Sequence, residues 1–136
     1  NGEEGTYDAY FYERHANAGL MDLFDWGNLT YITLGWTGKM NERTNFGAMY
    51  HMFTLTETGT GTGQFTRGIR GQTLAFGDNT KDDLGSEIDL YAEHMYDGGL
   101  STVLRLGYFM PGDHFDTAAG NEDEIMEVMI EGKLTF

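Results

Sequence analysis

The 136-residue sequence contains no cysteine, a single proline and no long apolar run. The absence of cysteine excludes disulfide bonds and thiol chemistry, and it leaves the compartment undecided. A membrane-spanning helix needs roughly 18 consecutive apolar residues, a length that no stretch of the sequence approaches. The same test does not detect membrane β-barrels, whose strands alternate apolar with polar residues.

Basic residues are scarce as well. Lys and Arg total 8 against 22 Asp and Glu, so the formal net charge is -14 and no nucleic-acid partner is expected. The length suits a single domain. The 20 glycines and 14% aromatic residues are typical of a twisted, strand-rich chain with tight turns. The sequence opens at Asn1 without an initiator methionine or a signal peptide, so we expect a processed or trimmed start.

The stretch 124–136 shows the clearest pattern in the chain. Every second residue lies in one apolar row, which consists of Met126, Val128, Ile130, Gly132, Leu134 and Phe136. The residues between them are mostly polar or charged. This period of two residues predicts a strand and excludes a helix. A chain that ends on such a strand, with an apolar face about long enough to cross a bilayer, is what a transmembrane β-barrel needs.

The sequence predicts about six strands in all, at residues 6–14, 28–40, 44–57, 84–96, 100–110 and 124–136. Besides the last strand, the apolar faces consist of Ile32, Leu34 and Trp36; Phe46, Ala48, Tyr50 and Met52; Ile88, Leu90 and Ala92; and Leu100, Thr102, Leu104, Leu106 and Tyr108. Within the long connections, a small amphipathic turn around residues 20–24 and an extra hairpin at 65–76 are open possibilities.

The connections between the strands alternate long and short along the chain. Outer-membrane barrels have this arrangement because their periplasmic turns are short and their extracellular loops are long. The sequence therefore predicts an all-β fold in which meandering antiparallel strands form part of a transmembrane β-barrel. A soluble, acidic β-sandwich that acts as a binding module is the competing hypothesis.

The polar faces of three predicted strands carry the residues that we expect to line a water-filled pore. They are Arg105, Asp89, Glu93, Glu87, Tyr91, Glu127, Glu131 and Lys133. These carboxylates could in principle form catalytic pairs. The favoured interpretation is that they line the lumen and pair with neighbouring bases, so no catalytic residue is predicted.

The turn after residue 96 fixes the register of two predicted strands. Directly opposed residues must face the same side, and opposing Tyr96 with Leu100 achieves this through a three-residue loop. Arg105 then lies opposite Tyr91, with Asp89 and Glu93 as its diagonal neighbours. We expect Arg105 to form an ion pair with one or both of these carboxylates.

Other chemistry finds little support in the sequence. Serine occurs only at Ser86 and Ser101, and neither stands in a motif with a base, which disfavours a serine hydrolase. Acidic clusters in the connections could bind calcium, namely Asp78, Asp82 and Asp83, and Asp113, Asp116, Asn121, Glu122 and Asp123. Neither cluster has EF-hand spacing, so a solvated acidic loop is favoured, and no metal or cofactor is predicted.

Four stretches resemble the C-terminal part of the alginate-export family of Gram-negative outer-membrane porins. They are GLMDLFDWGNL at 19–29, MYHMF at 49–53, LGSEIDLYAEH at 84–94 and LGYFMPGD at 106–113. The resemblance implies a single large β-barrel with more strands than this chain supplies, so the chain would be the last part of a longer barrel. An extra hairpin that closes a small barrel, or several chains sharing one wall, are the alternatives.

The resemblance also implies a function and a set of partners. It implies a porin of the outer membrane that permits passive diffusion of a hydrophilic solute, without catalysis. Lipid and lipopolysaccharide would surround the barrel, and the barrel-insertion machinery would read Phe136 as a terminal aromatic signal.

One departure from the family concerns charge, because a pore for a polyanion is expected to carry Arg and Lys. Here Arg105, Lys133 and Lys39 face five predicted pore-lining carboxylates. The solute class is therefore an anionic or neutral saccharide, or another small solute.

Overall fold

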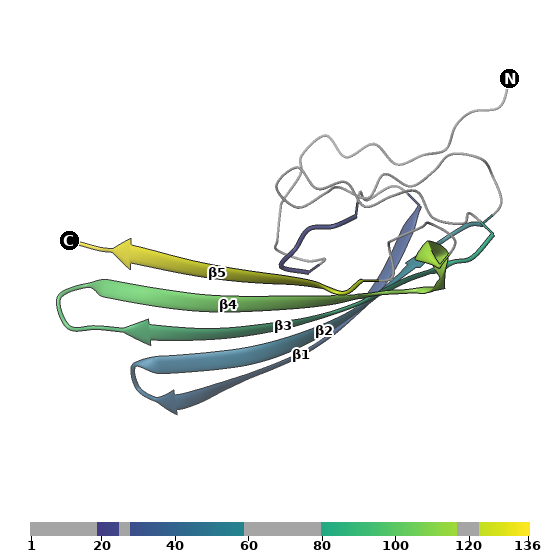
Figure 1. The fold of residues 1–136 in the computed structure, drawn as a ribbon. Coiled ribbons are helices and arrows are strands. Elements are labelled where there is room, and N and C mark those ends of the chain that lie inside the picture. The colour runs from purple at the N-terminus through teal and green to yellow at the C-terminus, as the bar shows by residue number, and fades with distance from the viewer. Residues whose placement is uncertain (1–18, 25–27, 59–79, 117–122) are drawn as a thin grey trace, which may run out of the picture.

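The computed structural model describes residues 19–24, 28–58, 80–116 and 123–136. Within these ranges the elements are β1 (Leu29–Asn41), β2 (Thr44–Leu55), β3 (Asp83–Met95), β4 (Leu100–Pro111), the 3-10 helix η2 (Asp113–Phe115) and β5 (Ile125–Leu134). The strands form one antiparallel sheet in the order β1-β2-β3-β4-β5 (Figure 1). Each strand therefore pairs with its neighbours in the sequence, as in a meander.

The predicted all-β fold is confirmed. Five of the six predicted strands are present, and their bounds differ from the expected ones by at most two residues. The predicted strand 6–14 and the possible hairpin 65–76 lie outside the described residues. No helix in the described ranges is long and apolar enough to span a membrane.

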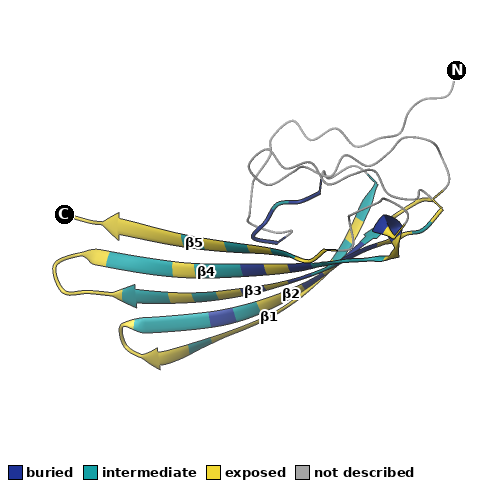
Figure 2. Cartoon of the chain, viewed as in Figure 1, coloured by how far each residue is buried: buried dark blue, intermediate teal, exposed yellow. Residues whose placement is uncertain are grey.

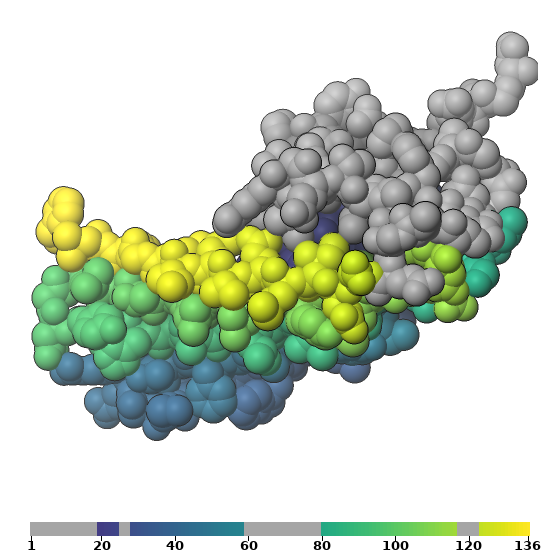
Figure 3. All heavy atoms as spheres, viewed as in Figure 1, coloured from purple at the N-terminus to yellow at the C-terminus, as the bar shows by residue number. Residues whose placement is uncertain are grey.

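The described strands build a single open sheet whose edges are β1 and β5. In the space-filling view, β5 runs in yellow along its edge (Figure 3). A β-sandwich needs a second sheet packed on the first, and the described part of the chain contains none. An open antiparallel meander of this kind is the form expected for a section of a barrel wall.

The register predicted around the turn between β3 and β4 is confirmed. Tyr91 lies opposite Arg105, and the amide of Tyr96 donates a hydrogen bond to the carbonyl of Leu100 over 2.8 Å. Gly98 and Gly99 both have positive φ, at 88° and 84°, a conformation that glycine adopts without a steric penalty. The glycines thus make the short connection possible.

One face of the sheet, here called the outer face, is apolar and exposed. Its exposed large side chains are Ile32, Leu34, Trp36, Tyr50, Met52, Ile88, Leu90, Leu104, Tyr108, Met126, Val128, Ile130 and Leu134. They come from all five strands at every second position. Figure 2 shows exposed residues in yellow on every strand. The exposed fractions reach 72% at Met126 and Ile130, so the described residues leave this face uncovered.

The opposite face, here called the inner face, changes character along the strands. Near the short turns it is polar, whereas near the long connections it is covered by an apolar cluster. The members of this cluster are Met21, Leu23, Phe24, Phe53, Leu55, Leu84, Phe109 and Phe115. Residues 19–24 form no helical turn there, because they lie extended and bent against the inner face (Figure 1). The chain bends at Leu20 and Met21, and the four apolar side chains of 20–24 are buried while Asp22 is half-buried, so the small amphipathic turn that the sequence left open is not helical.

Polar contacts hold the two ends of the sheet. At the short-turn end, the guanidinium of Arg43 and the carboxylate of Asp97 join two turns over 2.7 Å. At the other end, the amide side chain of Asn28 both donates to the carbonyl of Glu57, over 2.9 Å, and accepts from its N–H, over 2.7 Å. These bonds extend the pairing of β1 and β2 by side-chain contacts beyond the ladder itself.

The alternation predicts opposite surroundings for adjacent residues of one strand. If lipid covers the outer face, spin labels at Leu90 and Ile130 should collide with oxygen dissolved in lipid and be shielded from a water-soluble quencher. Labels at the neighbouring Tyr91 and Glu131 should show the reverse accessibility. Lys at position 90 or 130 should lower the free energy of unfolding by about 2–4 kcal/mol, because a charge would enter hydrocarbon. Equal accessibility on both faces would contradict the proposed orientation.

Candidate functional site

All eight side chains predicted to line a pore share the inner face. The ladder pairs Tyr91 with Arg105 and Asp89 with Gly107, and it places Glu127 on the far side of that glycine. The remaining members, Glu87, Glu93, Glu131 and Lys133, have the same parity. Their common face follows from the structure, whereas contact with a passing solute stays a prediction.

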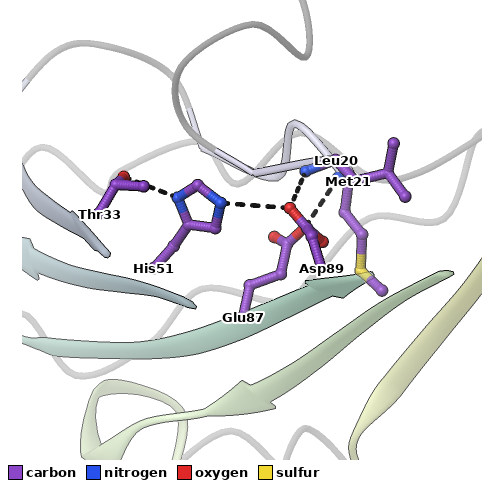
Figure 4. Close-up of polar contacts among 6 residues, drawn as sticks. All are labelled: Leu20, Met21, Thr33, His51, Glu87 and Asp89. Carbon is purple, nitrogen blue, oxygen red and sulfur yellow. Dashed lines mark hydrogen bonds and ion pairs between the residues drawn. The ribbon is translucent and has the colours of Figure 1, made fainter. Parts of the chain in front are cut away.

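Glu87 and Asp89 are buried, although the sequence predicts that they line a water-filled pore. Glu87 has no exposed surface and Asp89 retains 9%, because the segment Gly19–Phe24 lies over them. The amide of Leu20 donates to Asp89 Oδ2 over 2.8 Å, and the amide of Met21 donates to Glu87 Oε1 over 2.9 Å (Figure 4). Both carboxylates therefore bind the backbone of this segment, which is a correction to their predicted role as exposed wall residues.

The backbone of this segment approaches the sheet closely at Gly19. This residue has a φ of 90°, and a Cβ atom built on it would lie 2.5 Å from Glu87 Oε2. A second glycine makes room on the sheet itself, because a Cβ at Gly107 would lie 3.1 Å from Met21 Cε. Two glycines, one on each partner, thus permit the contact.

A row of polar contacts leads from β1 to the buried carboxylates. Thr33 Oγ1 lies 2.8 Å from His51 Nδ1, and His51 Nε2 lies 3.2 Å from Asp89 Oδ2 (Figure 4). His51 is only 2% exposed. The sequence places His51 on a strand without indicating a function, and only the MYHMF stretch hints at one. The structure makes it a link between three strands.

Apolar packing anchors the other end of the segment. Leu23 and Phe24 are buried, and the ring of Phe24 lies 4.9 Å from the ring of Phe53 and 5.6 Å from that of Phe109. Such tilted and edge-on ring pairs stabilise a contact by about 0.5–1.5 kcal/mol beyond the buried area. The segment is therefore held at one end by carboxylates and at the other by aromatic rings.

The predicted ion pair of Arg105 with Asp89 or Glu93 is wrong. Arg105 Nη2 instead lies 3.4 Å from Glu131 Oε2, on the neighbouring strand β5. Asp89 is turned toward the segment and His51, so its charge is engaged elsewhere. The side chains of Arg105 and Glu131 are 36% and 50% exposed, and an exposed pair of this kind contributes about 0–1 kcal/mol to stability.

A small pocket of about 60 Å³ lies where the segment ends and the open inner face begins. Its lining includes Gly19, Leu20, His51, Asp89, Tyr91 and Arg105. No group of three or more His, Asp or Glu side chains in the described ranges is placed to hold a metal ion. Of the acidic clusters, Asp78, Asn121 and Glu122 lie outside those ranges. Asp116 contacts Lys81 over 3.3 Å, and Asp83 accepts the amide of Gly85.

Comparison with known proteins identifies the family of this chain. A family model described as alginate export matches residues 1–128. The chain belongs to the alginate export family. No curated protein matches it. Alginate export proteins are transport proteins of the outer membrane and not enzymes, in agreement with the all-β fold of this chain.

The four stretches that resemble the alginate export family meet at this one site. The first supplies Gly19, Leu20 and Met21, the second His51 and Phe53, the third Glu87 and Asp89, and the fourth Gly107 and Phe109. The first stretch is distant from the other three in the sequence, and the resemblance did not indicate that it lies against them. The structure shows them as two partners of one contact, the segment and the sheet.

Replacing Gly19 tests whether the contact between the segment and Glu87 requires a residue without a side chain at this position. Gly19→Ala should destabilise the protein more than Gly98→Ala, because both positions have a φ near 90° but only the first meets a neighbour. The cost of positive φ alone is about 1–2 kcal/mol, which Gly98→Ala should show. Unfolding of the two variants in detergent or lipid by denaturant measures the difference. Equal losses would mean that Gly19 makes no close approach to Glu87.

Proposed function

We propose that this chain forms part of the wall of an outer-membrane β-barrel through which a hydrophilic solute diffuses passively. The observation that carries the proposal is the sheet itself, with an uncovered apolar outer face and a polar inner face on the same strands. A soluble protein rarely leaves so large an apolar surface exposed, whereas lipid would cover it in a barrel. Membership of the alginate export family supports the same conclusion.

The charges of the inner face bear on the solute. With Glu87 and Asp89 covered, the charged side chains that the strands contribute to this face are Lys39, Arg105 and Lys133 against Glu93, Glu127 and Glu131. Three positive and three negative groups balance one another, so the wall is less acidic than the sequence suggested. Such a wall suits a neutral or anionic saccharide, because it presents donors and acceptors without a strong repulsive field.

The wall is proposed to act without chemistry of its own. The two buried carboxylates accept hydrogen bonds from backbone amides, and His51 is placed between Thr33 and Asp89. These groups are thus committed to holding the segment Gly19–Phe24. The proposed role is therefore the shaping of a passage for diffusion.

Reconstitution into planar lipid bilayers tests the function. The protein should require detergent for solubility, migrate on denaturing gels according to whether it has been heated, and give discrete conductance steps. A neutral saccharide added at high concentration should lower the ion current by occupying the passage. A protein that stays monomeric in plain buffer and gives no conductance would support a soluble binding module instead.

The balance of wall charges generates a prediction for Arg105. Arg105→Ala leaves two positive groups against three negative ones and removes the partner of Glu131, so the channel should become more selective for cations. The reversal potential in a salt gradient measures this shift. Arg43→Ala is the matched control, because Arg43 is also paired with a carboxylate but lies in the turn between β1 and β2, at the short-turn end of the sheet. An unchanged reversal potential for Arg105→Ala would place this side chain outside the passage.

A further inference from the structure

The segment Gly19–Phe24 lies on the inner face, where a solute would have to pass. We propose that it is a constriction that limits the size of the solute, and that Glu87 and Asp89 are the positioning residues that hold it there. This inference rests on the proposed function, since a constriction has meaning only in a passage. It gives a role to Glu87 and Asp89, which are covered by the segment and are therefore not counted among the charged residues of the open inner face.

The two carboxylates supply hydrogen-bond acceptors for the backbone amides of the segment. A bent stretch of backbone laid on a sheet has amides that lack ladder partners, and burying such groups without hydrogen bonds is unfavourable. Asp89 Oδ2 and Glu87 Oε1 accept the amides of Leu20 and Met21 at 2.8 and 2.9 Å. The neighbouring inward positions Phe53 and Phe109 are apolar. The carboxylates thus occur where backbone amides need acceptors.

The segment contacts the sheet along its length. Gly19 sits directly against the Glu87 carboxylate, Met21 packs over Gly107, and the ring of Phe24 packs between those of Phe53 and Phe109. Leu23 is 1% exposed, as expected of a core residue. A stretch anchored at both ends narrows the passage permanently and does not act as a lid.

The segment covers only part of the length of the strands. The segment covers the inner face toward the long connections, and the face toward the short turns stays open, with Glu131 and Lys133 exposed. The pocket beside Leu20, Tyr91 and Arg105 marks the border between the two parts. A solute moving along the wall would therefore meet the segment and then the polar side chains beyond it.

Removing the acceptors should release the segment. In the double variant Glu87→Met and Asp89→Leu, apolar side chains of comparable length replace the carboxylates, and the amides of Leu20 and Met21 lose their hydrogen-bond acceptors. We expect a larger single-channel conductance and entry of larger neutral polyethylene glycols than in the unmodified protein. Asp97→Leu is the matched control, because it removes a carboxylate from the turn that follows the same strand, away from the segment and from the charged residues of the inner face. It should leave the polymer cut-off unchanged.

A disulfide can return the segment to the wall. The chain has no cysteine of its own, so Met21→Cys with Gly107→Cys introduces a single pair. The contact is close, since a Cβ at Gly107 would lie 3.3 Å from Met21 Cγ. In the double-variant background, oxidation should restore the original conductance and polymer cut-off, and reduction should abolish the rescue. A cross-linked channel that stays wide would overturn the inference.

A label at the segment tests its position without removing the carboxylates, which matters if the double variant fails to fold. Asp22→Cys modified with a bulky thiol reagent should lower the conductance strongly, whereas the same label at Glu42→Cys, in a short turn, should not. A labelled Asp22→Cys channel with unchanged current would overturn the constriction. Failure of the unmodified protein to form any channel would instead contradict the proposed function.

Discussion

In an antiparallel sheet, directly opposed residues face the same side, and every other feature of this chain depends on that pairing. The register that sets Tyr91 against Arg105 also sets Leu90 against Leu106 on the other side of the sheet. A slip of one residue would turn charged groups outward and apolar ones inward. Because the same hydrogen bonds determine both surfaces, the apolar outer face and the polar inner face are two results of a single constraint.

The inner face departs from simple alternation where the segment Gly19–Phe24 covers it. Two carboxylates and a histidine lie beneath that segment, and each is tied to a specific partner: a backbone amide, a neighbouring carboxylate or a threonine. Farther along the same face, the segment packs against the aromatic rings of Phe53 and Phe109. The inner face is thus an open polar surface near the short turns, and near the long connections it is the surface on which an irregular segment packs.

Much of this architecture could be predicted from the sequence, because strand period and turn parity are local properties. The bounds of β3 and β4 and the pairing of Arg105 with Tyr91 follow from such counting. The partner of Arg105 could not be predicted, because it depends on where Asp89 is directed, and Asp89 is engaged by residues 19–24. That segment has no periodic pattern, so the burial of Glu87 and the link through His51 emerge only in three dimensions.

The wide separation in sequence between the segment and its acceptors has a consequence for the order of assembly. Leu20 binds a carboxylate 69 residues later in the chain, and Met21 binds one 66 residues later. Closing so long a loop costs entropy that two hydrogen bonds alone do not offset, so β3 must first be placed between its neighbours. We therefore expect the hairpins to form before the segment docks. Docking of Phe24 requires the sheet to be assembled from β2 to β4, since its ring packs against Phe53 of β2 and Phe109 of β4.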